Sequence, residues 1–285
     1  WNFMIDEEVT EVDVDRPLPA GESMAVPASF NDQAVTSKVR QHSGYVWYER
    51  EFIVPKALRD QRLVLRFGSA THEAWVYVNG KFVVHHKGGF TPFESEINAF
   101  LVPGANRLTV RVSNLLDYTT LPVGNYSEKT DEQGKLIRKV DENFDFFNYA
   151  GLHRPIKIYS TPMNYIDDMV IVPEVDLGQK EANVNIRTHT VGAFVEVRVT
   201  ILDEQGSTVA HASGTDVQVT IQNVRLWQPL NAYLYTAKVE AFQNGELVDA
   251  YEEPFGVRKV EVSAGKFLLN GEPFYFKGFG KHEDT

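Results

Sequence analysis

The sequence predicts an all-β protein with two successive antiparallel sandwiches. Runs of alternating or β-branched apolar residues recur along nearly the whole chain, and turn residues bound them. At 285 residues the chain exceeds the usual size of one domain, so we expect two domains, each with its own core. Hydrophobic residues make up 43% and aromatic residues 12%, which excludes a disordered or collagen-like chain.

The first domain is expected over residues 1–162, with the boundary near Ser160-Thr161-Pro162. Its strands are predicted over Tyr45 to Val54, Arg62 to Phe67, Glu73 to Val78, Lys81 to His85, Arg107 to Ser113, and Ile156 to Tyr159. The dipeptide Asn79-Gly80 lies between two of these runs, and this pair suits the positive φ angles of a two-residue turn. We therefore expect a β-hairpin there.

Residues 119–144 differ from the rest of this domain because they are rich in charge and show little periodicity. A loop of this length is usually either a disordered excursion or a functional binding loop. The sequence leaves both interpretations open.

The second domain is expected over residues 163–258. Its apolar runs are "DDMVIVPEV", "ANVNIRTHT", "FVEVRVTILDEQGSTVAHA", "DVQVTI", "YLYTAKVEAF" and "ELVDAYEEPFGV". Six or seven short strands with turn signals every 8 to 12 residues are typical of an immunoglobulin-like sandwich, here without the cysteine pair of antibody domains.

Residues 259–285 belong to neither sandwich by sequence. A short hairpin is predicted over Glu261 to Leu269, turning at Asn270-Gly271 and leading into the apolar run Phe274 to Phe276. We expect that run to be a strand, which needs neighbouring strands to bury it.

Composition excludes several classes of partner. The net charge is −11 and no basic stripe is interleaved with aromatic residues, so we expect no nucleic-acid partner. No run approaches the roughly 18 apolar residues of a membrane-spanning helix, so we expect no membrane partner. The absence of cysteine suits a cytoplasmic protein. The chain begins at Trp1 rather than Met, so we expect its N-terminus to have been processed or cut, and a lost targeting segment stays open.

Two short patterns are interpreted as structural. His85 and His86 are adjacent on a predicted strand and should point to opposite faces, so we expect no metal site there. Asn125-Tyr126-Ser127 fits the glycosylation acceptor pattern, but that pattern is short enough to arise by chance, and we expect an ordinary loop.

Asp145 is the more informative candidate. It precedes Phe146, Phe147 and Tyr149, so a carboxylate lies beside a dense aromatic group, which is typical of a sugar site. The alternative is a structural aspartate that pairs with Arg154 under an aromatic core. The residues alone leave these two interpretations open.

The second candidate is the charged group Lys281 to Asp284, which contains His282. By composition it is a solvated terminal segment. Its position directly after an apolar run and two glycines is the argument for a functional role.

The sequence resembles glycoside hydrolase family 2 and, within it, the bacterial β-glucuronidases. The matching stretches occur in the family's order along essentially the whole chain: "WNF", "GYVWYEREF", "RFGSATHEAWVYVNGKFVVHHKGGFTPFE", "FDFFNYAGLHRPIKIYSTP", "LWQPLNAYLY", "FGVRKVEV" and "FLLNGEPFYFKGFGKHED".

This resemblance implies a jelly-roll sugar-binding domain, an immunoglobulin-like β-sandwich and a (β/α)8 catalytic barrel, of which residues 259–285 would be the first strand and its following loop. The chain would then be the N-terminal portion of a β-glucuronidase, about half of the enzyme. The alternatives are a fragment of a β-galactosidase-type enzyme of the same family and a freestanding carbohydrate-binding module.

The resemblance also implies the chemistry. The whole enzyme would hydrolyse β-D-glucuronides to glucuronate and an alcohol with retention, using two glutamates on later barrel strands and no cofactor. The 285 residues would contain no catalytic residue and would be inactive alone. Asp145 and His282 would contact the sugar, and the enzyme would be a homo-oligomer, often a tetramer in the family.

Overall fold

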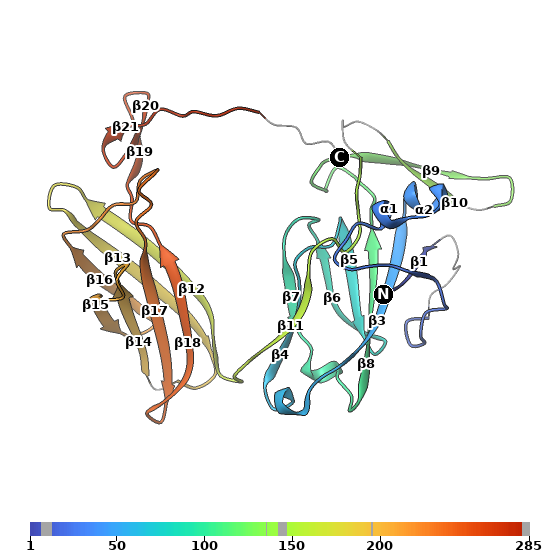
Figure 1. Cartoon of the computed structure of the whole chain (residues 1–285), viewed down its shortest axis with the longest axis horizontal. Coiled ribbons are helices and arrows are strands. Elements are labelled where there is room, and N and C mark those ends of the chain that lie inside the picture. The colour runs from blue at the N-terminus through green and yellow to red at the C-terminus, as the bar shows by residue number, and fades with distance from the viewer. Residues whose placement is uncertain (7–12, 135, 142–146, 195, 281–285) are drawn as a thin grey trace. The chain divides into compact units, whose positions relative to one another are not determined.

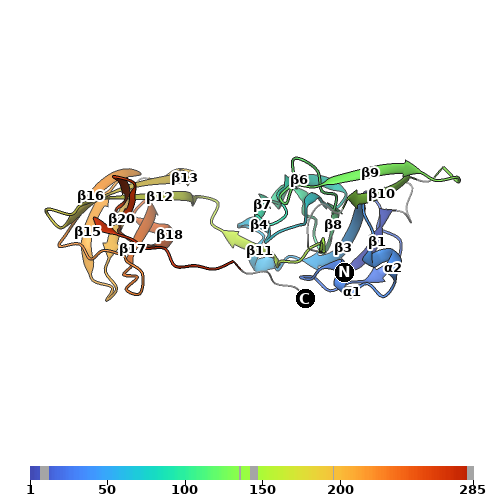
Figure 2. The same cartoon turned by 90° about the horizontal axis from the view of Figure 1, so that it is seen from above.

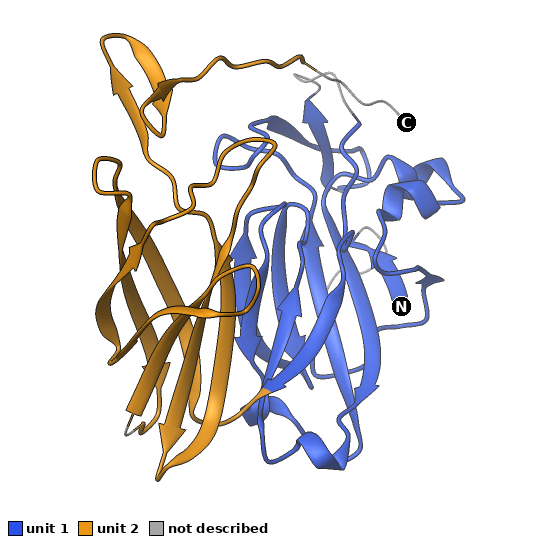
Figure 3. Ribbon diagram, turned by 60° about the vertical axis from the view of Figure 1, so that its left-hand side comes forward, with its two compact units in different colours: residues 1–160 blue, residues 161–285 orange. Residues whose placement is uncertain are grey.

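The computed structural model describes residues 1–6, 13–134, 136–141, 147–194 and 196–280 (Figure 1). The chain forms two compact units, Trp1–Ser160 and Thr161–Thr285 (Figure 3). Each unit contains its own cluster of buried hydrophobic residues. Within the described ranges, no helix has both the length and the apolar character needed to cross a membrane.

Unit 1 is a sandwich of two sheets. The larger sheet has the order β2-β1-β3-β8-β5-β6 and the smaller one the order β11-β4-β7. The larger sheet contains β1 Asn2–Ile5, β2 Glu22–Ser23, β3 Tyr45–Ile53, β5 Glu73–Val78, β6 Lys81–Lys87 and β8 Ala105–Ser113. The smaller sheet contains β4 Arg62–Phe67, β7 Phe93–Glu96 and β11 Ile156–Thr161. Each of the six strands predicted from the sequence is therefore present.

The core of unit 1 follows from the alternation of side chains along its strands. In β5, Ala74, Val76 and Val78 are fully buried, whereas the residues between them are partly exposed. Successive side chains of a strand point to opposite faces, so one face of β5 packs into the core. Burying one such Val contributes on the order of 1.5–3 kcal/mol.

The predicted hairpin at Asn79-Gly80 is confirmed. Asn79 has φ 52° and Gly80 has φ 81°, and the two residues connect β5 to β6. The side chain of Asn79 also accepts a hydrogen bond from the Arg107 backbone nitrogen at 2.9 Å and donates one to the carbonyl oxygen of Phe100 at 2.9 Å. The turn is therefore held against the beginning of β8.

The charged segment after residue 119 contains a second hairpin, which the sequence analysis did not predict. β9 Asn125–Thr130 and β10 Leu136–Asp141 pair antiparallel as a two-stranded sheet (Figure 2). The interpretation of this segment as a disordered excursion is thus wrong for these residues, as is the ordinary loop expected at Asn125-Tyr126-Ser127, which lies in β9. The interpretation as a binding loop stays a prediction. These strands show no alternation of apolar and polar residues, because a hairpin outside the sandwich core does not need an apolar face. Charged side chains pair across it instead: Arg138 on β10 lies 2.8 Å from Glu128 on β9.

The described residues of unit 1 also include these short helical turns: α1 Phe30–Gln33, α2 Ser37–Arg40, and the 3-10 turns η2 Lys56–Leu58 and η3 Asn98–Phe100. The two α-helices have polar caps. The side chain of Ser29 accepts a hydrogen bond from the Asn31 backbone nitrogen, and that of Thr36 accepts one from Val39.

The sandwich of unit 2, within the described residues, has seven strands in two sheets, ordered β12-β13-β16 and β15-β14-β17-β18. The strands are β12 Tyr165–Asp176, β13 Glu181–Val191, β14 Glu196–Leu202, β15 Thr208–Ser213, β16 Asp216–Gln222, β17 Tyr235–Gln243 and β18 Glu246–Phe255. Alternate residues of β13, β14 and β17 are buried between the sheets. The predicted immunoglobulin-like sandwich is confirmed.

Three further short strands follow in unit 2: β19 Val260–Ser263, β20 Lys266–Leu269 and β21 Glu272–Pro273. The predicted hairpin is present, but its turn does not lie at the predicted Asn270-Gly271. The hairpin between β19 and β20 turns at Ala264 and Gly265, and Asn270-Gly271 makes the next turn, between β20 and β21. Both dipeptides have positive φ angles, so both suit a two-residue turn.

Residues 274–280 carry no strand. Three aromatic side chains here are exposed, Tyr275 at 79%, Phe276 at 65% and Phe279 at 90%, whereas Phe274 is partly buried. A strand requires backbone hydrogen bonds to a neighbour, and among the described residues only β20 is near, through the bond from the Phe274 nitrogen to the Phe267 oxygen at 2.9 Å. The assignment of this segment to the first strand of a barrel stays a prediction.

Candidate functional site

The candidate site lies where several loops of unit 1 meet at one end of its larger sheet. Glu73 at the start of β5 pairs with Lys87 at the end of β6 and with Ser113 at the end of β8. Because neighbouring strands are antiparallel, the residues before β5, after β6 and after β8 gather at the same end of the sheet.

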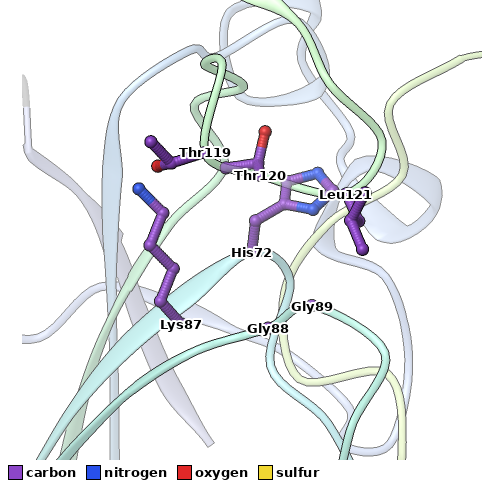
Figure 4. Close-up of a pocket in the computed structure, with 7 residues that line it drawn as sticks. All are labelled: His72, Lys87, Gly88, Gly89, Thr119, Thr120 and Leu121. Atoms are coloured by element: carbon purple, nitrogen blue, oxygen red, sulfur yellow. The ribbon is translucent and has the colours of Figure 1, made fainter.

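A pocket opens between these loops (Figure 4). The following residues line it: His72, Lys87, Gly88, Gly89, Thr119, Thr120 and Leu121. Its volume is about 110 Å³. Pockets that enclose a whole drug-sized ligand are several times larger, about 300–1,000 Å³, so this one admits only a small group or part of a larger ligand.

His72 forms the buried wall of the pocket and is only 2% exposed. Its Nε2 lies 2.7 Å from Oδ1 of Asn148, whose Nδ2 donates to the carbonyl oxygen of Asn114 at 2.9 Å. Since that donation leaves Asn148 Oδ1 as the acceptor, we assign the hydrogen to Nε2 of His72. Nδ1 of His72 has no hydrogen-bond partner among the described residues.

The protonation state of His72 follows from its surroundings. Burial lowers the pKa of His72 most strongly, the hydrogen bond to Asn148 opposes this, and the nearby charge of His153 lowers it further. The ring is therefore neutral near pH 7, and its Nδ1 carries a lone pair that can accept a hydrogen bond.

Lys87 forms the opposite wall. Its Nζ donates to Oδ2 of Asp117 at 3.1 Å, while Oδ1 of Asp117 accepts from the backbone nitrogen and hydroxyl of Thr119, both at 2.7 Å. Burial would raise the pKa of Asp117, but these hydrogen bonds and the Lys87 charge lower it overall. The ion pair therefore fixes the loop over residues 117–120 beside the pocket.

The segment after residue 146 is tied to the same loops. Nδ1 of His153 lies 2.7 Å from the hydroxyl oxygen of Thr71, which itself donates to the carbonyl oxygen of Gly89 at 3.2 Å. Nη1 of Arg154 donates to the carbonyl oxygen of Phe90 at 2.9 Å. Burial lowers the pKa of His153, a hydrogen bond involving Gly151 opposes this, and the Arg154 charge adds to the lowering.

The two site residues predicted from the sequence, Asp145 and His282, both lie outside the described residues. Beside Asp145 in the sequence, Phe147 is 42% exposed, and its ring centroid is 4.7 Å from that of Tyr149. The guanidinium of Arg40 lies 5.2 Å from the Phe147 ring centroid, a cation–π contact. The sugar-contact and ion-pair interpretations of Asp145 both stay predictions.

The histidine pair on β6 lies as predicted, with its side chains on opposite faces. Nε2 of His85 is 2.7 Å from Oε1 of Glu73, and the His85 ring stacks on Trp75. His86 instead stacks on Phe93. Among the described residues, no group of three His, Cys, Asp or Glu side chains could hold a metal ion.

Sequence reasoning missed the pocket. His72 and Asn148 are 76 residues apart, and Lys87 and Asp117 are 30 apart. No spacing rule connects residues at these separations, because their proximity depends on the order of strands in the sheet.

Comparison with known families defines the class of protein. Residues 1–162 match the model described as "Glycosyl hydrolases family 2, sugar binding domain", and residues 164–258 match the one described as "Glycosyl hydrolases family 2". The two sandwiches are thus those of a glycosyl hydrolase. The chain belongs to glycosyl hydrolase family 2.

Individual relatives support the assignment to this family. The β-glucuronidase of Streptococcus agalactiae is 46% identical over all of this chain and 47% of its own length, and that of Mus musculus is 40% identical over 92% of this chain and 42% of its own. The structure of Ruminococcus gnavus β-glucuronidase in complex with D-glucuronic acid has a TM-score of 0.88 and 37% identity, covering all of this chain and 49% of that one. The chain spans about half the length of the relatives it matches.

Proposed function

We propose that this chain supplies the two β-sandwich domains of a β-glucuronidase, which hydrolyses β-D-glucuronides to glucuronate and an alcohol with retention. The observation that carries the proposal is the 46% identity to the Streptococcus agalactiae β-glucuronidase along the entire chain. The relatives reported above bear the same name, which favours this activity over that of a β-galactosidase-type enzyme or a freestanding carbohydrate-binding module.

The proposal places the residues that cleave the glycosidic bond outside these 285 residues. Retaining glycoside hydrolysis needs two carboxyl groups about 5–5.5 Å apart, one as acid/base and one as nucleophile. We propose that both are glutamates of a barrel domain contributed by the other half of the enzyme. Asp145 and His282 of this chain would contact the sugar, and no cofactor would be needed.

An assay of two polypeptides tests the proposal. Residues 1–285 alone, and the chain extended to the length of its relatives, are given 4-nitrophenyl β-D-glucuronide, with the β-D-galactoside as matched control. We expect the extended chain to hydrolyse the glucuronide at least about 100-fold faster than the galactoside, corresponding to about 2.7 kcal/mol of transition-state discrimination. We expect no turnover from the 285 residues.

Two outcomes would contradict the proposal. Turnover by residues 1–285 that persists through repurification would place catalytic carboxylates within this chain. A preference of the extended chain for the galactoside would favour the β-galactosidase-type alternative.

The cellular setting is part of the same proposal. We propose a cytoplasmic homo-oligomer whose partner is a glucuronide and which has no nucleic-acid or membrane partner. The cysteine-free sequence and the net charge of −11 support the location and the lack of a nucleic-acid partner. Light scattering of the extended protein at micromolar concentration measures the assembly, and a monomer would exclude the oligomer.

A further inference from the structure

The dipeptide Asn-Gly occurs three times in the chain, at Asn79-Gly80, Asn244-Gly245 and Asn270-Gly271. Each pair forms the two-residue turn between paired strands, β5 and β6, β17 and β18, or β20 and β21. The φ angles of the three turns are nearly the same, at 52° and 81°, 53° and 84°, and 53° and 83°. Differences in reactivity among the three turns must therefore come from the asparagine side chains and their surroundings.

Asparagine followed by glycine can react with its own backbone. The glycine nitrogen attacks Cγ of the asparagine, a C–N bond forms, and the side-chain nitrogen leaves as ammonia, which takes up the proton that the glycine nitrogen loses. Water then opens the cyclic imide at either of its carbonyl carbons, which gives aspartate or isoaspartate. Glycine favours the reaction because it has no Cβ to hinder the approach. The asparagine side chain must be free to turn toward the nitrogen that attacks it.

Hydrogen bonds hold the side chain of Asn79 in place. Its Oδ1 accepts from the Arg107 backbone nitrogen at 2.9 Å. Its Nδ2 donates to the carbonyl oxygen of Phe100 at 2.9 Å and to Oδ1 of Asn106 at 2.8 Å. Turning Cγ of Asn79 toward the Gly80 nitrogen would break these bonds.

The side chain of Asn270 is held in the same way. Its Oδ1 accepts from the Lys259 backbone nitrogen at 3.0 Å, and its Nδ2 donates to the carbonyl oxygen of Trp227 at 3.0 Å. Both ends of this amide are thus bound to backbone groups outside the turn. The fold restrains Asn270 as it restrains Asn79.

Asn244 lacks such restraint. Its side chain is exposed and makes no hydrogen bond with any described residue. A Cβ built on Gly245 would meet no atom within 4 Å, so the space around this glycine is open to water. Cγ of Asn244 can therefore turn toward the Gly245 nitrogen without the loss of a hydrogen bond.

We propose that Asn244 is a site of spontaneous modification, at which the native protein converts to aspartate and isoaspartate through the cyclic imide. The fold protects Asn79 and Asn270 from the same reaction. The reaction needs water as its only co-reactant. This inference is independent of the proposed glucuronidase activity, because it concerns a turn of the second sandwich and needs no substrate.

Isoaspartate would disturb the pairing of β17 with β18. It adds one atom to the main chain within the two-residue turn, next to the pair Gln243 and Glu246 (Figure 1). Turn length fixes the register of a hairpin, and β17 buries Val239 and Ala241 in the core of the second sandwich. We therefore expect isoaspartate at position 244 to lower the stability of this sandwich.

Peptide mass spectrometry tests the proposal on the 285-residue chain. The chain is incubated at mildly alkaline pH, both folded and unfolded in urea, and is sampled over time. Trypsin releases the three dipeptides on separate peptides, residues 67–81, 239–258 and 267–277. In the folded chain we expect Asn244 to lose ammonia at least about 10-fold faster than Asn79 or Asn270, because hydrogen bonds must break first at those two residues. In urea we expect the three rates to become similar.

Three outcomes would overturn the proposal. One is equal rates at the three asparagines of the folded chain, and another is a faster reaction at Asn79 or Asn270. The third is the same ranking in urea as in the folded chain, which would show that local sequence sets the rates and not the fold. Each outcome is read without a glucuronidase assay, so failure of the proposed activity leaves the test intact.

The variant Asn244→Gln supplies a matched control for the structural effect, because its longer side chain disfavours ring closure. The wild type and the variant undergo the same incubation, and the thermal unfolding of each is measured before and after. We expect the unfolding temperature of the second sandwich to fall in the wild type and to stay unchanged in Asn244→Gln. An equal fall in both proteins would contradict the expected effect of isoaspartate at this turn.

Discussion

Nε2 of His72 lies 2.7 Å from Oδ1 of Asn148, and this contact joins the loop before β5 to the segment that follows residues 142–146. Asn148 completes the link through its Nδ2, which donates to the carbonyl oxygen of Asn114 at 2.9 Å. One amide side chain therefore connects three loops of unit 1. It also sets which nitrogen of the His72 ring carries the hydrogen.

Asn148→Ala should destabilise unit 1. The substitution leaves Nε2 of the buried His72 and the carbonyl oxygen of Asn114 without this partner, which we expect to lower the free energy of unfolding by about 1–3 kcal/mol. Urea denaturation measures the loss. The control Asn183→Ala removes a bond to Thr220 on an exposed sheet face and should cost less than about 0.5 kcal/mol. Equal losses would contradict the linking role of Asn148.

Asp6→Asn should change how stability depends on pH. Asp6 contacts His42 and Arg138, each at 3.1 Å. Burial alone would raise the pKa of Asp6, but the hydrogen bond and charge of His42, a backbone hydrogen bond from Tyr45 and the Arg138 charge lower it overall, below the usual value of an aspartate. A carboxyl whose folded pKa lies below its unfolded value stabilises the fold above the unfolded pKa, and this contribution is lost as the pH falls through the folded pKa.

The measurement is the difference in unfolding free energy between wild type and Asp6→Asn from pH 6 to pH 2. We expect a constant difference in favour of the wild type above about pH 5, shrinking progressively below about pH 4. Arg138→Gln removes one of the cations near Asp6 and should reduce the pH-dependent part of the stability that Asp6 contributes. A free-energy difference that grew on acidification would contradict the lowered pKa of Asp6.

Gly80→Ala should destabilise the β5–β6 hairpin more than Gly134→Ala destabilises the turn between β9 and β10. Both glycines have φ 81°, so both substitutions force alanine into the left-handed region at about 1–2 kcal/mol. A Cβ on Gly80 would also meet Oδ1 of Asp15 at 2.5 Å, whereas one on Gly134 meets nothing within 4 Å. Thermal unfolding of the two variants measures the extra cost, and a smaller loss for Gly80→Ala would show that Asp15 does not pack there.

Asp145→Ala tests the proposed sugar contact in the chain extended to the length of its relatives. Loss of one charge-assisted hydrogen bond of about 1.5–3 kcal/mol should lower kcat/KM for a β-glucuronide roughly 10- to 100-fold with the fold intact. The exposed Asp13, which pairs with Arg16, supplies the control Asp13→Ala. Unchanged kinetics for Asp145→Ala would contradict the sugar contact and favour a structural role for this residue. A large loss of stability would favour its pairing with Arg154.

The sequence predicted the strands with a visible run of alternating or β-branched apolar residues and missed the shortest strands and a charged hairpin. β5 and β13 alternate between buried and exposed residues, and both were expected within a few residues of their bounds. The missed strands are β1, β2, β7 and β21, which have four residues or fewer, and the β9–β10 hairpin. A strand too short to show a period, or one without a buried face, produces no apolar alternation to detect.

The candidate site could be predicted only in part. The aromatic group after Asp145 was recognised because its members are adjacent in the sequence, and the family resemblance rested on contiguous stretches of the same kind. Asn148 lies within one of those stretches, but nothing in its neighbourhood indicates that its partners are His72 and Asn114.

The sequence by itself therefore determined the local features of this protein: the period of its strands, the Asn79-Gly80 turn and the presence of two sandwiches. These depend on backbone geometry and on side chains a few residues apart. Only the tertiary structure decided that His72, Lys87 and Thr120 line one pocket, with Nδ1 of His72 left without a partner. The reason is that strand order and register bring distant residues together, and they arise from the closure of the whole sandwich, which no short stretch of sequence encodes.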